Sequence, residues 1–594
     1  MDAREAYSVK VLSDPFVNGD ECYFVQNWIE GNEYGSSIFR MAHGRVERVT
    51  FGGSERSPSV YGGYLYYISS AGGEESLMRM GRMSGPERVA TFGKIHKFLP
   101  YNDDMLAIVE AKAEAGTLFV AKRQMYRYDT RGYLRSRKKL VSVKGGRDIV
   151  AGDFDVVDFA VSGDDVIVST TEEDDSTGLH QVYRLISGLS GREKLTGGRG
   201  LATSVGFTPS GEAVFIGHRS GIAPWKQKSV MAADGRVLSG GVNCSLDVIT
   251  DLFVGGAQGL VTDGSLYTIA HEGGDTYVYD VLARKRLTGR GMSVRYFHSS
   301  GGNLAYILTE PGRPSLLRFG EQEYDPNPGV RGAEVENFRT GGGEYWFIHS
   351  GSERPTVLSV HGGPHMAYGN CYYIEFNFLA ANGFNVVYGN PRGSSGYGDD
   401  FARACVGDWG GRDFEDVLSF LDDARDRFGL TGKVAITGGS YGGFMTNVAI
   451  VKSNRFACAV SEMPVSNLLS MLGTSDIGFW FNAVESGIED PWSRESQERL
   501  LRMSPIYSVK DARTPTMYIH GEEDFRCPIE QSEQMFMALR YYGVDSELVR
   551  YSGDSHEHAR HGRPQNMVDR LERKLAWFRK YMVDGEGVGQ GAAP

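Results

Sequence analysis

The chain has 594 residues, and its 75 acidic and 63 basic side chains give a formal net charge of −12. This length exceeds one typical core, so we expect two or more domains, and the acidity argues against nucleic acid or an anionic membrane surface as a partner. No apolar run approaches the roughly 18–20 residues that cross a bilayer. The first residues lack a signal-peptide core, and the six cysteines form no C-x-x-C pair, so we expect a cytoplasmic location.

A loop-then-strand unit recurs through the first half of the chain. A turn rich in Gly, Asp, Asn or Ser precedes each apolar or alternating strand, and the units lie mostly about 40–50 residues apart, the length of one four-stranded propeller blade. The units lie at 18–26, 62–69, 102–110, 163–170, 210–217, 263–270 and 301–308. The spacing predicts a seven-bladed β-propeller over residues 1–330, with paired β-sandwiches or an irregular all-β region as the alternatives.

The pattern changes after a stretch rich in Pro, Gly and charge at 320–344, which we interpret as a connection between domains. Residues 331–582 then alternate apolar β-rich runs with helical patterns, which predicts a parallel sheet with helices on both faces, as in the α/β-hydrolase fold. The predicted strands are 356–362, 385–390, 433–439, 515–521 and 546–553, and the predicted helices are 372–384, 413–429, 530–543 and 565–582. Residues 583–594 are typical of a disordered tail.

The segment "GGSYGG" (438–443) places Ser440 in a G-x-S-x-G motif between a predicted strand and the helical run at 444–451. Small neighbours allow the chain to turn sharply there, and the turn lifts the hydroxyl above the sheet at a helix N-terminus that favours negative charge. We therefore predict that Ser440 is a nucleophile.

A serine nucleophile needs a general base and a carboxylate that orients it, in the chain order Ser, Asp or Glu, His. Asp524 and His556 each follow a predicted strand beyond Ser440 and are our candidates. The alternatives are Glu522, Glu523 or Asp554 as the carboxylate and His558 or His561 as the base. The spacing of His556, His558 and His561 also permits a metal site, but no matching cysteine or carboxylate set accompanies it, so we expect neither a metal nor a cofactor.

An oxyanion hole requires two N–H donors near the nucleophile. The N–H of Tyr441, directly after Ser440, is the first candidate. The glycine-rich "HGGPH" (361–365) follows a predicted strand, and the N–H of Gly363 is the second candidate, with an ordinary glycine turn as the alternative.

Six motifs in order carry a resemblance to a known family. They are "HGGPH" (361–365), "NPRGSSGYG" (390–398), "GDWGGRDFEDV" (407–417), "GGSYGG" (438–443), "HGEEDFRCP" (520–528) and "SHEHARHGRP" (555–564). Together they resemble the prolyl oligopeptidase family of serine peptidases, in which a propeller caps an α/β-hydrolase domain. The resemblance implies that Ser440 is acylated, that His556 acts as base and then acid, and that Asp524 orients it. It also implies that Arg526 holds a substrate carbonyl, with a surface ion pair as the alternative.

Within the family, the HGGP loop and the run around His556 look most similar to the acylaminoacyl peptidases. This implies release of N-acylated amino acids from short blocked peptides. Cleavage of the prolyl oligopeptidase or dipeptidyl peptidase type, a carboxylesterase and a catalytically silent propeller protein are the alternatives.

Two further features bear on specificity. The resemblance implies that a dipeptidyl peptidase would bind a free amine through paired glutamates; Glu74–Glu75 and Glu172–Glu173 are adjacent pairs, but neither has a context typical of such a site. Phe479, Trp480 and Phe481 are candidates for an apolar substrate pocket, with core packing as the alternative. The sequence leaves open whether the chain forms a homo-oligomer.

Overall fold

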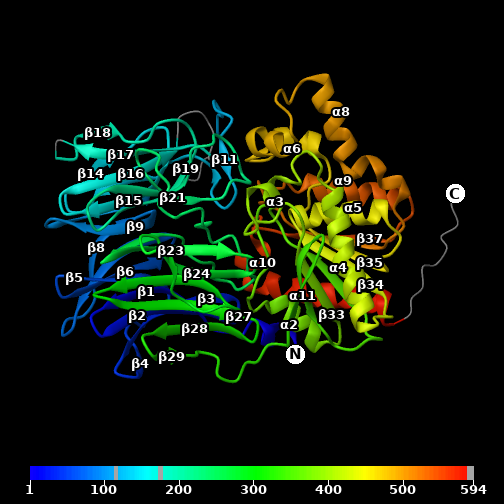
Figure 1. Ribbon diagram of the computed structural model, residues 1–594, viewed down its shortest axis with the longest axis horizontal. Helices are drawn as coiled ribbons and strands as arrows, with labels where there is room; N and C mark the ends of the chain where they lie inside the picture. The colour runs from blue at the N-terminus through cyan, green and yellow to red at the C-terminus, as the bar shows by residue number, and fades with distance from the viewer. Residues whose placement is uncertain (113–117, 172–177, 187, 585–594) are drawn as a thin grey trace.

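The computed structural model describes residues 1–112, 118–171, 178–186 and 188–584. Figure 1 shows β-sheets of the first half of the chain on one side and a mixed α/β domain on the other. Glu172–Glu173 and residues 585–594 of the predicted tail lie outside the described residues. Within these residues, no helix is both long enough and apolar enough to cross a membrane.

The first half forms successive antiparallel sheets, each built from neighbouring strands in the chain, as the loop-then-strand repeat predicts. The first three sheets contain β1 (Val11–Asn18), β2 (Glu21–Glu30), β3 (Glu33–Ala42) and β4 (Arg45–Arg48); β5 (Glu55–Tyr61), β6 (Tyr64–Ala71), β7 (Glu74–Gly81) and β8 (Glu87–Phe92); and β9 (Lys94–Tyr101), β10 (Asp104–Glu110), β13 (Lys139–Ser142) and β14 (Arg147–Val150). A hairpin of β11 (Arg127–Tyr128) and β12 (Gly132–Tyr133) is inserted between β10 and β13.

The later sheets continue this order. They contain β15 (Val156–Ser162), β16 (Asp165–Thr171), β17 (His180–Ile186) and β18 (Gly191–Lys194); β19 (Leu201–Phe207), β20 (Ala213–His218) and β21 (Ser229–Ala232); and β22 (Leu260–Asp263), β23 (Ser265–Glu272), β24 (Asp275–Asp280), β25 (Lys285–Arg286), β26 (Ser293–Ser300), β27 (Asn303–Glu310), β28 (Arg313–Phe319) and β29 (Gln322–Tyr324). In the last sheet β24 and β26 are joined by one parallel pair, Thr276 and Ser293. The count of seven blades therefore stays a prediction.

The first and last sheets of this domain meet through side chains. Leu12, Phe24 and Met41 share an apolar cluster with Ile307 and Leu317. Among the described strands, no ladder joins β1–β4 to β26–β29. Side-chain packing, rather than hydrogen bonding between strands, therefore joins the first and last sheets of the domain.

The second domain contains one eight-stranded sheet in the order β30-β31-β33-β32-β34-β35-β36-β37. Its strands are β30 (Glu336–Thr340), β31 (Gly343–Ile348), β32 (Thr356–Val360), β33 (Asn385–Asn390), β34 (Val434–Gly439), β35 (Cys458–Glu462), β36 (Thr516–Gly521) and β37 (Ser546–Tyr551). Strands β32–β37 pair in parallel, as predicted, whereas β30 and β31, in the stretch predicted as a connection, are antiparallel. These strands and β29 lie largely within the stretch 320–344, so the irregular connection is only 325–335.

Helices cover both faces of this sheet, as predicted. On one face lie α2 (Ile374–Ala381) and α11 (Pro564–Met582), and on the other lie α4 (Arg412–Phe428), α5 (Tyr441–Lys452) and α9 (Glu530–Tyr541). The remaining segments are α1 (Ala3–Ala6), α3 (Asp399–Arg403), α6 (Leu468–Thr474), η1 (Gly478–Asn482), α7 (Ala483–Glu485), α8 (Arg494–Met503), η2 (Pro505–Asp511) and α10 (His558–His561). Side chains of β32 alternate between the two cores, with Val357 in one and Leu358 in the other.

The first residues of the chain pack against the second domain. Ala3, Ala6 and Tyr7 are buried in the same apolar cluster as residues of α2 and α11, and Figure 1 shows the N-terminus beside these helices. A boundary near residue 330 remains a prediction, and the segment before β1 bridges the two domains.

Candidate active site

Ser440 lies at a strained turn between β34 and α5. Its φ of 60° and ψ of −120° place a residue with a side chain in a region that favours glycine. The neighbouring glycines make the turn sterically feasible, since a Cβ at Gly442 would lie 2.0 Å from the carbonyl oxygen of Val360. The backbone N–H of Ser440 donates to the carbonyl oxygen of Glu462 at 3.0 Å, which holds the turn against β35.

Asp524 and His556 form the pair that the sequence predicts. The Nδ1 atom of His556 lies 2.7 Å from Oδ2 of Asp524, and both residues are buried. The other carboxylate oxygen, Oδ1, accepts the backbone N–H groups of Arg526 at 2.9 Å and Cys527 at 2.8 Å. The carboxylate is therefore held by its own loop, and it fixes the Nδ1 edge of the imidazole.

A second histidine supports the carboxylate. Nε2 of His520 lies 2.7 Å from the carbonyl oxygen of Cys527 and 3.1 Å from Oδ2 of Asp524. A carbonyl oxygen only accepts, so Nε2 carries a hydrogen that both oxygens share. His520 lies within the motif "HGEEDFRCP" (520–528), and its sequence context alone does not indicate this role.

The alternative candidates have other contacts. Glu522 pairs with Arg550 at 3.0 Å, and Asp554 accepts the backbone N–H of Arg563 at 3.1 Å. Nε2 of His558 faces Glu462 at 3.4 Å, whereas His556 faces Asp524. His556 and His558 thus face different carboxylates.

Electrostatics favour an ionised Asp524 and a basic His556. Burial alone would raise the pKa of Asp524, but His556 and the hydrogen bonds from both histidines hold it well below its usual value. Burial alone would lower the pKa of His556, and the charge and hydrogen bond of Asp524 outweigh this, so its pKa is raised. His556 is thereby a stronger proton acceptor than an isolated imidazole.

Ser440 and His556 line one cavity of about 410 Å³. The Ser440 hydroxyl contacts Sγ of Cys527 at 3.8 Å. Among the described side chains, no hydrogen bond joins Ser440 to His556, which is a common feature of sites without substrate.

The "HGGPH" loop lies beside Ser440. An added Cβ at Gly362 would be 3.3 Å from Cβ of Ser440, and Gly363 and Tyr441 both line the cavity. Gly363 has a φ of 124°, and a Cβ there would lie 2.7 Å from the N atom of His365, so this position requires glycine. The N–H of Tyr441 belongs to the first turn of α5 and has no intrahelical acceptor.

The predicted substrate residues are only partly brought together. Arg526, Trp480 and Phe481 line the cavity, and Phe479 is not among the lining residues. The expectation for Phe479 was wrong because successive side chains of the helical turn η1 point in different directions. Arg526 is held by Asp476 through Nε at 2.8 Å and Nη2 at 3.1 Å, so it is a partly buried forked pair rather than a surface one.

The glutamate pair Glu74–Glu75 lies on β7, where Glu75 pairs with Arg56 at 2.7 Å and accepts the N–H of Ile95 at 2.6 Å. These contacts join β7 to β5 of the same sheet and to β9 of the next sheet. The pair is not among the residues that line the cavity.

Asp129, at the turn of the β11–β12 hairpin, was missed by the sequence analysis. Its Oδ1 accepts the backbone N–H of Phe525 at 3.0 Å and that of His556 at 3.3 Å. Its own N–H donates to Asp476 at 2.9 Å. One carboxylate of the first domain thus binds both loops that carry Asp524 and His556.

Two family models match the chain in succession. The model described as "Acylaminoacyl-peptidase, N-terminal beta-propeller domain" matches residues 25–314, and the model described as "Prolyl oligopeptidase family" matches residues 371–585. These matches confirm the resemblance to the prolyl oligopeptidase family that the six motifs predict. The predicted combination of a β-propeller with an α/β-hydrolase domain is confirmed.

Two curated proteins are similar in sequence to part of the chain, to different degrees. An uncharacterised peptidase of Bacillus subtilis (strain 168) is 44% identical over 230 residues, which are 38% of this chain and 35% of the relative. Acylamino-acid-releasing enzyme 1 of Oryza sativa subsp. japonica is 33% identical over 238 residues, 39% of this chain and 30% of the relative. The match thus spans about a third of the length of these curated relatives.

The fold has a close counterpart among solved structures. The acylaminoacyl peptidase of Pyrococcus horikoshii superposes with a TM-score of 0.87 at 20% identity, over 100% of this chain and 98% of that one. The two proteins therefore share the whole two-domain architecture.

Proposed function

We propose that this chain is a serine peptidase that releases N-acylated amino acids from the blocked N-termini of short peptides. One observation carries the proposal: Ser440, at its strained turn, lines the same cavity as His556, whose Nδ1 is 2.7 Å from Asp524. The match of residues 371–585 to the prolyl oligopeptidase family model supports the reaction class, and the name of the rice relative supports the acylated substrate.

The first half-reaction follows from this arrangement. Oγ of Ser440 attacks the scissile carbonyl carbon while Nε2 of His556 takes the hydroxyl proton. Asp524 stabilises the imidazolium that forms. The N–H groups of Tyr441 and Gly363 receive the developing oxyanion, and the leaving amine then takes the proton from His556 as the C–N bond breaks.

In the second half-reaction, water attacks the acyl-enzyme. His556 takes a proton from the water and returns it to Ser440, which frees the acylated amino acid. Arg526 is already oriented by Asp476 through Nε and Nη2, and the remaining N–H groups of its guanidinium would donate to a substrate carbonyl on the acyl side. Trp480 and Phe481 would contact the side chain next to the scissile bond.

The cavity spans both domains, since Tyr128, Lys228 and Asp247 of the first domain also line it. A site covered in this way suits short peptides better than folded proteins. We also propose a reducing compartment such as the cytoplasm, because all six cysteines are unpaired and buried.

The test is release of p-nitroaniline from three substrates by the purified chain: an acetyl-amino-acid anilide, an N-blocked Gly-Pro anilide and a free-amine Gly-Pro anilide. We expect the first to be preferred. Ser440→Ala should lower kcat by about 10⁴-fold or more, because the nucleophile is lost while the cavity stays intact.

The other outcomes are separable. Preference for either proline substrate would contradict the acylated specificity and leave the catalytic residues in place. Cleavage of p-nitrophenyl esters without cleavage of any anilide would indicate a carboxylesterase. Anilide cleavage that survives in Ser440→Ala would contradict the assignment of the nucleophile.

A further inference from the structure

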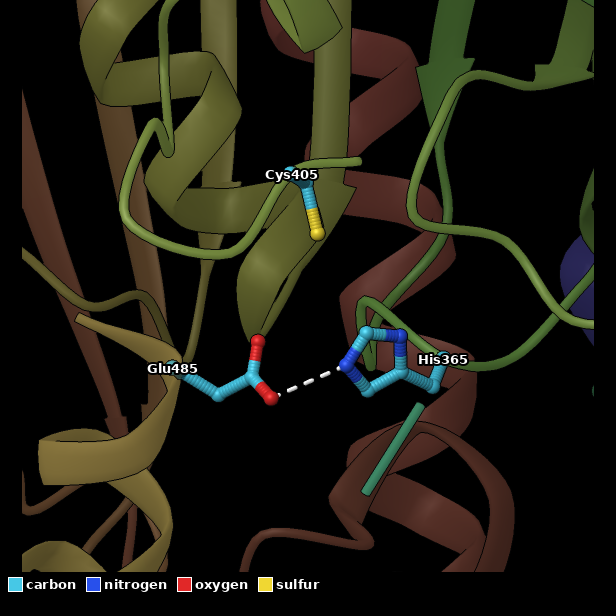
Figure 2. Close-up of side chains that lie close together, drawn as sticks. All are labelled: His365, Cys405 and Glu485. Atoms are coloured by element: carbon cyan, nitrogen blue, oxygen red, sulfur yellow. Dashed lines mark hydrogen bonds and ion pairs between the residues drawn. The ribbon is translucent and has the colours of Figure 1, made fainter. Parts of the chain in front are cut away.

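Three side chains from separate loops converge beside the cavity. His365 ends the "HGGPH" loop, Cys405 follows α3, and Glu485 ends α7. One imidazole nitrogen, the thiol sulfur and one carboxylate oxygen all lie within 4.8 Å of one another. Figure 2 shows the sulfur, the carboxylate and the imidazole pointing toward a common space.

The contacts of His365 require a proton or a cation beside its Nε2 atom. Its Nδ1 lies 2.8 Å from the carbonyl oxygen of Gly393, which only accepts, so Nδ1 carries a hydrogen. Its Nε2 lies 2.9 Å from Oε1 of Glu485. Two lone pairs would face each other across this gap, so either a proton or a metal ion must lie between them.

Glu485 has a second, unsatisfied oxygen. The side chain is 1% exposed, and Oε2 has no hydrogen-bond partner among the described residues. Figure 2 shows this oxygen on the side of the carboxylate that faces Cys405. A buried carboxylate oxygen without a partner is costly, and a ligand that binds it would remove that cost.

We propose that His365, Cys405 and Glu485 form a binding site for a zinc ion, with a fourth position left for water. Nitrogen, sulfur and oxygen donors in this combination suit zinc, whereas calcium and magnesium prefer oxygen ligands alone. Tetrahedral zinc would separate the ligand atoms by roughly 3.3–3.7 Å, given its usual bond lengths. His365 and Glu485 would therefore separate slightly, and the sulfur would approach.

The exchange balances charge and protons. Without metal, the His365–Glu485 pair holds one extra proton and Cys405 is a thiol, so the cluster is neutral. With zinc, His365 is neutral, Glu485 and Cys405 are anionic, and the ion carries two positive charges. Binding therefore releases two protons to the solvent and leaves the buried cluster neutral.

The surroundings raise the pKa of both His365 and Cys405, which agrees with a proton on each group before metal binds. Burial would lower the pKa of His365, but Glu485, Gly393 and Asp247 raise it above its usual value. Burial, Glu485 and Asp413 raise the pKa of the Cys405 thiol. Because zinc binding releases protons, zinc affinity should rise with pH.

The test uses Co²⁺ as a spectroscopic substitute for Zn²⁺ in the full chain. We expect one equivalent of Co²⁺ to produce a near-ultraviolet thiolate-to-cobalt band that Zn²⁺ removes by competition. Cys405→Ser should abolish the band, and Glu485→Gln should weaken zinc affinity at least tenfold. Cys371→Ser, at another buried cysteine, is the matched control and should keep the band.

Other results would overturn the site. Absence of the band in the native chain would do so, as would a band kept in Cys405→Ser but lost in Cys527→Ser, since Cys527 is the thiol beside Ser440. Proton release on zinc binding to the native chain in weak buffer needs no variant, and fewer than one proton per ion would contradict the exchange. None of these readouts depends on peptidase activity.

Discussion

Two of the segments by which the first domain contacts the second do so in different ways. Val248 forms a parallel β-bridge with Ala367, supported by backbone hydrogen bonds of 2.9 and 3.0 Å on either side. The turn of the β11–β12 hairpin instead extends the side chain of Asp129 to the loops of Asp524 and His556. The first contact is made by backbone at a fully buried residue, and the second by one side chain at the candidate catalytic pair.

The difference indicates a division of tasks. Next to Val248, Asp251 accepts the N–H groups of Ile374 and Glu375, both at 2.8 Å, and so caps α2, whose own N-cap residue supplies no side-chain hydrogen bond. Loss of that contact should weaken the joint between the domains. Loss of the Asp129 contact should disturb the catalytic loops and leave the joint in place.

The largest effect is expected from Asp129→Ala. The substitution leaves the backbone N–H groups of Phe525 and His556 without their acceptor, which costs about 1–3 kcal/mol per buried group and allows both loops to shift. We expect kcat on the preferred anilide to fall by about 10–100-fold with a smaller change in KM. Steady-state kinetics of Asp129→Ala and Asp129→Asn would measure this. Asparagine keeps a side-chain oxygen that accepts hydrogen bonds, so Asp129→Asn should retain more of the native kcat than Asp129→Ala.

The control is Asp153→Ala, which removes a propeller carboxylate that is 66% exposed and pairs with Arg123. It should leave kcat within twofold. If Asp129→Ala has native kcat, or if asparagine restores nothing, the hairpin does not position the catalytic loops.

An intermediate effect, on stability rather than rate, is expected from Asp251→Ala. Removal of the cap exposes two buried donors at the start of α2 and should lower stability by about 1–3 kcal/mol. Differential scanning calorimetry should show a melting temperature lower by several degrees with kcat nearly unchanged. Asp251→Asn should cost less, because burial raises the pKa of Asp251 to about 6, which means that its charge is itself poorly accommodated.

A result in which Asp251→Ala lowers kcat as strongly as Asp129→Ala would remove the distinction between the two contacts. Asp234→Ala, which removes an exposed carboxylate of the first domain, serves as the reference for stability.

The features that the sequence predicts depend on residues close together in the chain, whereas the features that it misses depend on residues far apart. The strands, the apolar face of α11 and the positions of Ser440, Asp524 and His556 follow from local periodicity and from motifs at strand ends. Asp129 was missed because its partners lie about 400 residues away, and its local context, "YDTRGY", is that of any turn. Cys405 and Glu485 were missed for the same reason, since metal-ligand patterns are recognised from short spacings.

Strands β30 and β31 were missed for a different reason. Their glycine-rich, charged surroundings are typical of a connection, and packing against the sheet edge overrides that local preference. Phe479 was misplaced because a run of three aromatics does not indicate which side chains point to the cavity.

The smallest expected effect is a shift in the pH profile of kcat/KM, which distinguishes the charge of Asp129 from its hydrogen bonds. Asp129 is among the charges that raise the pKa of His556, and burial, followed by the charge of Asp524, raises the pKa of Asp129 itself to about 6. Because His556 must be neutral to accept a proton, kcat/KM should rise with pH, with a midpoint above the ordinary imidazole value of about 6.5. Asp129→Asn removes the charge and keeps the acceptor, so the midpoint should move down by about half a pH unit at a similar plateau. A midpoint that moves up would mean that the charge of Asp129 does not act on His556, and a lower plateau with an unchanged midpoint would assign its effect to geometry alone.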